Sequence, residues 1–166
     1  MVMNKDFKYP DKAAYEWVVR TLESKGVTAR KIAEIVYDLQ RKYLPNKTVD
    51  DFTVEVKKVM HKRELLNNAM CALWLDQTAE MGIMPSPLRE IVRADDGVFG
   101  TDEALASGIA SLWGTIGFTN YGYVDKTKPG IIGQLDTTPT QVNTFIDDIV
   151  GAIVAAVCGK MAHATA

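Results

Sequence analysis

The sequence predicts an all-α fold, a compact bundle of about six helices with the C-terminal helix at its centre. Apolar residues recur at helical spacing along most of the chain. Ser, Thr and Asp stand where helices would begin, and Gly or Pro stand where they would end. There are no convincing strands. The chain has 166 residues, 47% hydrophobic and 24% charged, so we expect one domain, residues 1–166, with a sizeable core.

Three helical regions are expected in the first half of the chain. They cover residues 11–26, 28–45 and 48–82, and each opens on Asp or Thr, side chains that can cap a helix. Gly ends the first region and Pro ends the second. The second has the clearest helical period in the chain, and the third leaves room for a break near His61.

The second half is expected to hold three more helices and an ordered loop. Ser86 and Pro87 mark a short helix that runs to about Arg93, and Thr101 can cap a helix from 102 to 113. Residues 122–136 lack periodicity and are expected to form the loop. Thr138-Pro139-Thr140-Gln141 combines a capping box with proline at the first helical position, so the last helix is expected from 139 to about 163. Glycines expected to allow close packing are Gly108, Gly114 and Gly117.

Two adjacent aspartates interrupt the apolar last helix. Apolar residues from 142 to 157 cover well over half of its circumference, which is typical of a buried central helix. Asp147 and Asp148 flank a narrow strip of small residues that leaves room for an ion or a ligand. Buried carboxylates need a cation, a basic partner or water. The pair is therefore either part of a site or paired with Lys or Arg from another helix.

The C-terminal half is rich in acids. Between Arg93 and Lys160 the only basic residues are Lys126 and Lys128. The eight acids of the same stretch are Asp95, Asp96, Asp102, Glu103, Asp125, Asp136, Asp147 and Asp148. Oxygen ligands suit Mg²⁺ or Mn²⁺, and a lysine supplies a point charge for a phosphate. The other interpretation is that the lysines neutralise surface acids, that Asp102 and Glu103 stabilise a helix dipole, and that Asp95-Asp96-Gly97 is a turn.

Several classes of protein are disfavoured. The net charge of −2 and the absence of a dense basic helix argue against nucleic-acid binding. The basic half, residues 1–66, with 14 Lys and Arg against 10 Asp and Glu, favours ordinary solvated helix faces over a phosphate or membrane surface. The longest apolar run has ten residues, and no signal peptide is apparent. Cys71 and Cys158 have no metal-ligand spacing and are expected to be reduced thiols in a cytoplasmic protein.

Read in order, the carboxylate segments resemble the phosphatidylglycerophosphatase A family, and especially its branch labelled low-temperature-requirement C. The family's Asp-x-x-Lys-Pro loop is similar to residues 125–129, with Asp136 at matching spacing. Its Ile-Asp-Asp-Ile-Val helix is similar to residues 146–150, and its Asp-Glu pair is best matched by Asp102-Glu103. The resemblance covers roughly residues 76–158 and departs from the membrane-embedded members over residues 1–75.

The resemblance implies Mg²⁺-dependent removal of the terminal phosphate from phosphatidylglycerophosphate, which yields phosphatidylglycerol. It implies that Asp102, Glu103, Asp125, Asp147 and Asp148 bind metal or orient water and that Lys128 binds phosphate. The catalytic residues would be Asp102, Glu103, Asp125 and Asp148. Beyond the resemblance, we expect Asp136 as a further metal ligand because it is an acid of the same cluster, and Lys126 as a second phosphate-binding residue because it is the other lysine of the stretch. The rival hypothesis is a non-catalytic helical oligomer that binds a metal, a small phosphate ligand or a lipid headgroup in an acidic pocket.

The expected partner is a phosphomonoester, with a lipid phosphate as the candidate that the resemblance names. A homo-oligomer is expected, because the C-terminal half is apolar and symmetric dimers are the commonest soluble oligomers. The expected location is the cytoplasm, with at most peripheral association at the inner face of the membrane.

Overall fold

In the computed structural model, residues 6–164 are described, and they form nine α-helices and one 3₁₀-helix with no strand. The helices are α1 (Asp11–Ser24), α2 (Ala29–Gln40), α3 (Val49–Val59), α4 (Arg63–Glu80), α5 (Leu88–Ala94), α6 (Thr101–Ala110), η1 (Ser111–Trp113), α7 (Gly114–Thr127), α8 (Ile131–Asp136) and α9 (Ile146–Ala164). Helix accounts for 72% of the chain. The predicted all-α class is confirmed, and the number of helices exceeds the expected six.

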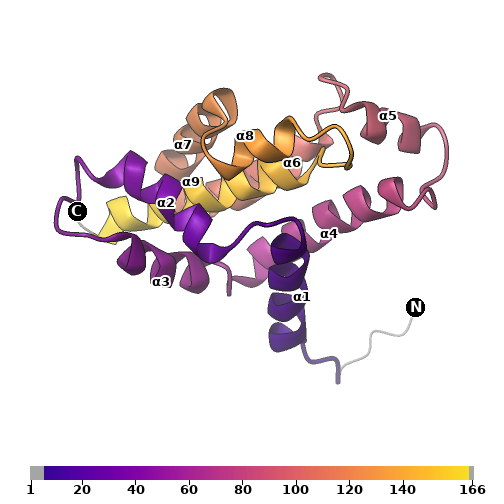
Figure 1. Cartoon of the computed structure of the whole chain (residues 1–166). Helices are drawn as coiled ribbons and strands as arrows, with labels where there is room; N and C mark the ends of the chain where they lie inside the picture. Colours follow the sequence, from indigo (N-terminus) through magenta and orange to yellow (C-terminus); the bar gives the residue numbers. More distant parts are fainter. Residues whose placement is uncertain (1–5, 165–166) are drawn as a thin grey trace.

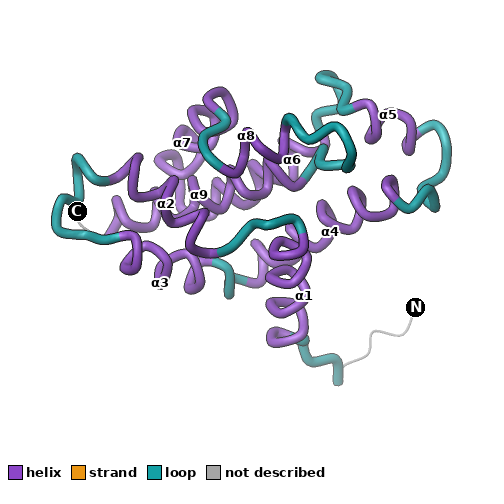
Figure 2. Tube along the Cα trace, viewed as in Figure 1, coloured by secondary structure: helices purple, strands orange, loops and turns teal. Residues whose placement is uncertain are grey.

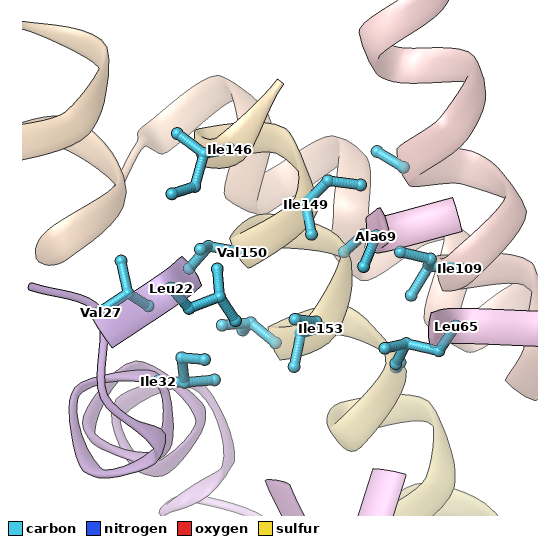
Figure 3. Packing of buried hydrophobic residues seen from close by; sticks show 14 of the residues in the cluster. Leu22, Val27, Ile32, Leu65, Ala69, Ile109, Ile146, Ile149, Val150 and Ile153 are labelled. Atoms are coloured by element: carbon cyan, nitrogen blue, oxygen red, sulfur yellow. The ribbon is translucent and has the colours of Figure 1, made fainter. Parts of the chain in front are cut away.

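Helix α9 is the centre of the bundle, as predicted. Figure 1 shows it running through the middle of the molecule, and α2, α3, α4, α6, α7 and α8 all pack against it. Every residue from Ile146 to Gly159 is buried. Figure 3 shows how Ile149 and Ile153 of α9 lie among side chains of other helices, including Leu65 and Ile109. An apolar arc this wide is satisfied only by neighbours on several sides.

Several helix starts follow the local signals in the sequence. The Thr28 hydroxyl accepts a hydrogen bond from the backbone N–H of Lys31 at the start of α2. Thr48 and Asp51 form a capping box at the start of α3. The expected break falls between α3 and α4 and contains His61. Asp11 and Thr101 are the first residues of α1 and α6 rather than caps, and neither start has a side-chain cap.

The interpretation of residues 122–136 as a loop was wrong. They contain the second half of α7 and all of α8, separated by a short turn at Lys128-Pro129-Gly130. The apolar residues of α7 follow no clear period, but Gly117, Tyr121 and Val124 are buried, and the helix packs along α9. Packing against a neighbour stabilises a helix whose own sequence signals it weakly.

The predicted start of the last helix was also wrong. Helix α9 begins at Ile146, and residues 137–145 form an irregular connection from α8. The Thr138 hydroxyl donates to the backbone carbonyl of Gln134 instead of capping a following helix. Side-chain hydrogen bonds of this kind compete with helix formation. Figure 2 places this connection and the loop between α5 and α6 at the same end of the bundle.

Helices α1, α4 and α5 extend to one side of the bundle in Figure 1. Both α1 and α5 pack against α4, which in turn contacts α6 and α9. Within residues 6–164, no helix combines the length and the apolar character that crossing a membrane requires.

Candidate functional site

The centre of the candidate site is the ammonium group of Lys128. Helix α7 ends at Thr127, and Lys128 follows it with φ 42° and ψ 55°, the left-handed conformation. Its backbone N–H donates to the carbonyl of Val124, which closes the last turn of α7. A lysine with positive φ is uncommon and is maintained only where its surroundings favour it. Here four carboxylates surround the side chain.

Three helices supply those carboxylates. Asp125 comes from the last turn of α7, Asp136 is the last residue of α8, and Asp147 and Asp148 lie in the first turn of α9. Lys128 Nζ lies 2.7 Å from Asp147 Oδ2, 3.0 Å from Asp125 Oδ1, 3.7 Å from Asp136 Oδ1 and 3.7 Å from Asp148 Oδ1. Residues that are well separated in the sequence therefore converge on one cation. Below, the Lys128 cluster means Lys128 with these four aspartates.

The two aspartates of α9 are the most deeply buried acids of the Lys128 cluster. Asp147 is 4% exposed and Asp148 is 5% exposed. The Asp148 Oδ1 atom is inaccessible to water and has no hydrogen-bond partner among the described residues. The Lys128 ammonium, 3.7 Å away, is too far for a hydrogen bond, and a buried carboxylate oxygen without one is costly, so it marks a place where a closer cation or a proton would be favoured.

Burial governs the proton affinities of these groups. Burial raises the pKa of Asp147 to about 6, in spite of the hydrogen bond from Lys128. Burial and then the negative charge of Asp147 raise the pKa of Asp148 to about 8. Burial alone would lower the pKa of Lys128, but Asp147 and the other carboxylates outweigh it and raise that pKa above its usual value. At neutral pH the cluster thus holds a charged lysine and a protonated Asp148.

Asp102 and Glu103 lie beside the Lys128 cluster, in the first turn of α6. Asp102 is 7% exposed and accepts a hydrogen bond from the backbone N–H of Glu103. A hydrogen bond with the Asp102 carboxyl, then burial, and then the Asp102 charge raise the pKa of Glu103, and the charge of Asp125 adds to the effect. Because the charge of Asp125 affects the pKa of Glu103, Asp102 and Glu103 lie close enough to the Lys128 cluster to interact with it electrostatically.

Two residues that interact with these acids were not predicted from the sequence as site residues. Asp95 follows α5 in the left-handed conformation with φ 48°, and burial together with the charges of Asp102 and Asp136 raises its pKa. The only sequence signal was the turn at 95–97, which gave no reason to place Asp95 beside α8 and α9. The turn itself is present, since the carboxylate of Asp96 accepts from the backbone N–H of Val98.

The other missed residue is Tyr121, one helical turn before Asp125 on α7. Its hydroxyl is buried next to Asp148 without forming a hydrogen bond of ordinary geometry. Burial and the charges of Asp148 and Asp125 raise its pKa well above the usual value. Its spacing from Asp125 is the i, i+4 spacing of one helix face, a signal that is too common to identify a site residue.

Lys126 is not brought into the cluster. It is exposed on α7 and forms no ion pair with any residue between 6 and 164. Among the residues expected to form the site, the structure therefore groups the six predicted acids and Lys128. A small cavity of about 160 Å³ reaches this group at Asp136, and its lining also includes Asp95, Arg93 and Asn143 but none of the other predicted site residues.

The donor set fits a hard divalent cation by its chemistry. Every donor is a carboxylate oxygen, as Mg²⁺ prefers, and Asp148 Oδ1 lacks a partner. In the described part of the chain, however, no three His, Cys, Asp or Glu side chains are already arranged to hold a metal ion. The Lys128 ammonium lies between the carboxylates where a cation would be attracted, so metal binding requires these side chains to rearrange.

Comparisons with known proteins agree on one family. The family described as phosphatidylglycerophosphatase A matches residues 17–163. The uncharacterized protein YutG of Bacillus subtilis is 44% identical over 143 residues, which are 86% of this chain and 86% of YutG.

Two solved structures have closely similar folds. The low temperature requirement C protein of Listeria monocytogenes is 44% identical, with a TM-score of 0.88 over 92% of this chain and 97% of that one. Protein YpjQ of Bacillus subtilis is 39% identical, with a TM-score of 0.89 over 95% of this chain and 98% of that one. The family match spans the Lys128 cluster, Asp102 and Glu103. The chain belongs to the phosphatidylglycerophosphatase A family.

Proposed function

We propose that this protein is a metal-dependent phosphomonoesterase that removes the terminal phosphate of phosphatidylglycerophosphate. The observation that carries the proposal is the convergence of Asp125, Asp136, Asp147 and Asp148 on Lys128, beside Asp102 and Glu103. Family membership supports the reaction and the lipid phosphate substrate. We place the protein in the cytoplasm, where it would reach a lipid substrate from the inner face of the membrane.

The proposed cofactor is Mg²⁺, with Mn²⁺ as a substitute. Asp125, Asp136, Asp147 and Asp148, with Asp102 and Glu103 beside them, would hold it. When bound, the cation supplies charge neutralisation at the phosphoryl oxygens and lowers the pKa of water.

The chain's own residues have distinct roles in this proposal. Lys128 is the one cation of the cluster, so it is suited to bind the phosphate once its carboxylate partners turn to a metal. In the metal-free protein Asp148 can hold a proton, because burial and the charge of Asp147 raise its pKa to about 8, and it would release that proton to become a metal ligand. The buried walls from α7 and α9 limit water near these groups and so strengthen their interactions.

The test is phosphate release by the purified protein from phosphatidylglycerophosphate in detergent and from a water-soluble phosphomonoester. Release is expected only with Mg²⁺ or Mn²⁺, and a chelator should abolish it. Asp148→Asn and Lys128→Ala should each reduce turnover by at least about tenfold, or about 1.4 kcal/mol of transition-state stabilisation. Asp96→Asn is the matched control, because Asp96 is an exposed acid in the turn beside the site and Asn can keep its hydrogen bond to Val98.

A non-catalytic binding protein is the second candidate. It is favoured by one observation, that the carboxylates are engaged with Lys128 rather than arranged as a ligand set. It is preferred if no phosphomonoester is hydrolysed with either metal, yet Mg²⁺ raises the melting temperature and Asp148→Asn removes that rise. If Mg²⁺ affects neither activity nor stability, both candidates fail.

A further inference from the structure

Helix α9 begins without a cap from its own segment. The first N–H groups of a helix have no partner within the helix and must find one elsewhere. At α9 that partner is Asp76, which lies in the fourth turn of α4 and 69 residues before Phe145. The Asp76 carboxylate accepts from the backbone N–H of Phe145 at 3.1 and 3.2 Å and from that of Ile146 at 2.9 Å.

We propose that Asp76 is a positioning residue, which holds the first turn of α9 so that Asp147 and Asp148 meet Lys128. The proposal rests on the geometry of the proposed site and does not require that the site hydrolyse a phosphate. Asp76 itself touches none of the four carboxylates through a hydrogen bond; it acts through the backbone that carries two of them.

Asp76 can position the aspartates of α9 directly, because the backbone groups that it binds are next to them in the sequence. Asp147 immediately follows Ile146, whose N–H the carboxylate binds, so a shift of that N–H moves the whole first turn. Phe145 and Ile146 are 0% and 1% exposed, which leaves no room for water to replace a lost acceptor. The preceding connection is irregular, so it offers no regular backbone pairing that would fix the turn instead.

The cost of burying Asp76 also argues for a specific role. The side chain is 3% exposed and has no ion pair with any residue in the 6–164 range. Burial raises its pKa well above the usual value, while the two backbone N–H groups act in the opposite direction. A buried acid without a basic partner is retained at a cost in stability, and here the gain is the orientation of a helix end.

The test is Asp76→Leu, which keeps the approximate size and shape of the side chain but removes both acceptor oxygens. The backbone N–H groups of Phe145 and Ile146 then lose their acceptor, so the first turn must shift or fray. The matched control is Leu65→Ala, a buried change on the same helix, about 16 Å along α4 from Asp76 at 1.5 Å per residue. It weakens the core beside Ile153 without touching the start of α9 (Figure 3).

Two readouts by NMR do not depend on catalysis. In the wild type, the amides of Phe145 and Ile146 should be protected from hydrogen exchange, and the Lys128 ammonium, half-buried and paired with Asp147, should give its own slowly exchanging signal. Asp76→Leu should speed exchange of both amides by about tenfold or more and should shift or abolish the Lys128 signal. Leu65→Ala should lower the melting temperature and keep both signatures.

Each alternative result would overturn the proposal. If both amides stay protected in Asp76→Leu, Asp76 does not hold the turn. If the amides open but the Lys128 signal is unchanged, the cap is structural and does not position the site. If Asp76→Leu fails to fold, the wild type still decides: unprotected amides at Phe145 and Ile146 would contradict the cap. All of these results stand whether or not the protein releases phosphate.

Discussion

Lys128 carries one positive charge among four carboxylates, and this imbalance determines the chemistry of the site. Asp147, at 2.7 Å, takes the closest contact with the ammonium. Asp148, at 3.7 Å, is left with an oxygen that has no hydrogen-bond partner in the described structure. A second full negative charge there is unfavourable, so Asp148 retains a proton up to about pH 8. The same excess of oxygen donors would attract a divalent cation, which would displace that proton.

The first prediction concerns stability and pH. The pKa of Asp148 rises from its ordinary 3.8 to about 8 in the folded state, so the folded chain binds more protons than the unfolded chain between these values. The contribution of Asp148 to stability is therefore present at low pH and is lost as the pH rises to about 8. Asp147, with a pKa raised to about 6, has the same sign over a narrower range.

Thermal unfolding at several pH values between about 5 and 8.5 would measure this loss. We expect the melting temperature of the wild type to fall from about pH 5, where both aspartates contribute, and to level off near pH 8; Asp148→Asn should reduce the fall because Asn does not ionise. Asp96→Asn should keep the wild-type slope. An equal slope in Asp148→Asn and the wild type would contradict a raised pKa at Asp148.

A second prediction uses Lys128→Met, which keeps the length of the side chain but removes its charge. The change leaves the buried carboxylates of the Lys128 cluster without their cation, and breaking a buried pair in this way costs about 3–5 kcal/mol. Mg²⁺ at millimolar concentration should then raise the melting temperature of Lys128→Met more than that of the wild type, since the metal no longer competes with the ammonium. If Mg²⁺ stabilises the variant no more than the wild type, the lysine and the metal do not share a site.

At the scale of the helices, glycines allow α7 to pack closely against both α6 and α9. A Cβ added to Gly117 would meet the backbone carbonyl oxygen of Ala110, and a Cβ added to Gly159 would lie 3.0 Å from the Cα and N of Gly117. Backbone atoms cannot move aside as a flexible side chain can, so a methyl group on Gly117 would push α7 away from the end of α6, and one on Gly159 would push α9 away from α7. Because α7 carries Asp125 and α9 carries Asp147, their separation also sets the width of the site.

The third prediction follows from that contact. Gly117→Ala should destabilise the protein by about 1–3 kcal/mol, the usual cost of overpacking. Gly122→Ala, on the same helix with nothing within 4 Å of the added Cβ, should be neutral or stabilising by up to about 1 kcal/mol, because Ala favours helix. Denaturant unfolding of the two variants would measure both effects. A Gly117→Ala variant as stable as Gly122→Ala would show that α7 is not packed against the end of α6 as described.

The helices that could be predicted are those whose signals are local. The caps at Thr28 and Thr48 act within three residues, and the sequence shows them directly. Helix α7 depends on packing against α9, which no local pattern reveals. The error at the start of α9 has the same origin, because its cap is Asp76, distant in the sequence, while the local capping box at 138–141 is not used.

The site residues also divide into those that the sequence could predict and those that it could not. The six acids and Lys128 could be identified because they stand in segments whose order resembles one family, and the structure brings them together. Asp95 and Tyr121 could not, because each is a single residue whose role comes from its position beside other elements. Lys126 was expected at the site from its residue type alone, and helix geometry instead places it on the exposed surface of α7.

For the whole molecule, the notable surface is where α1 and α4 meet. A shallow groove there is lined by Trp17, Met70, Cys71 and Trp74, and the Trp74 side chain is 51% exposed. Between Glu64 and Glu80, α4 carries a single charged residue, the buried Asp76, so its outward face has no charge over about four turns. Monomeric proteins rarely leave such a face in water, and it suits the homo-oligomer expected from the sequence.

The last prediction is therefore self-association through this groove. A two-fold axis beside α4 would pair the groove with its own copy, the arrangement of most soluble dimers, and would bury Trp74. Light scattering at micromolar concentration should give a mass above that of the 18.3 kDa chain. Trp74→Glu should return the mass to that of the monomer, because a buried interface does not accept an unpaired carboxylate.

Phe118→Glu is the matched control: Phe118 is 50% exposed on α7, so the same loss of an aromatic side chain and the same added charge should leave the mass unchanged. A monomeric wild type would contradict the expected oligomer, and an unchanged mass for Trp74→Glu would place the interface elsewhere.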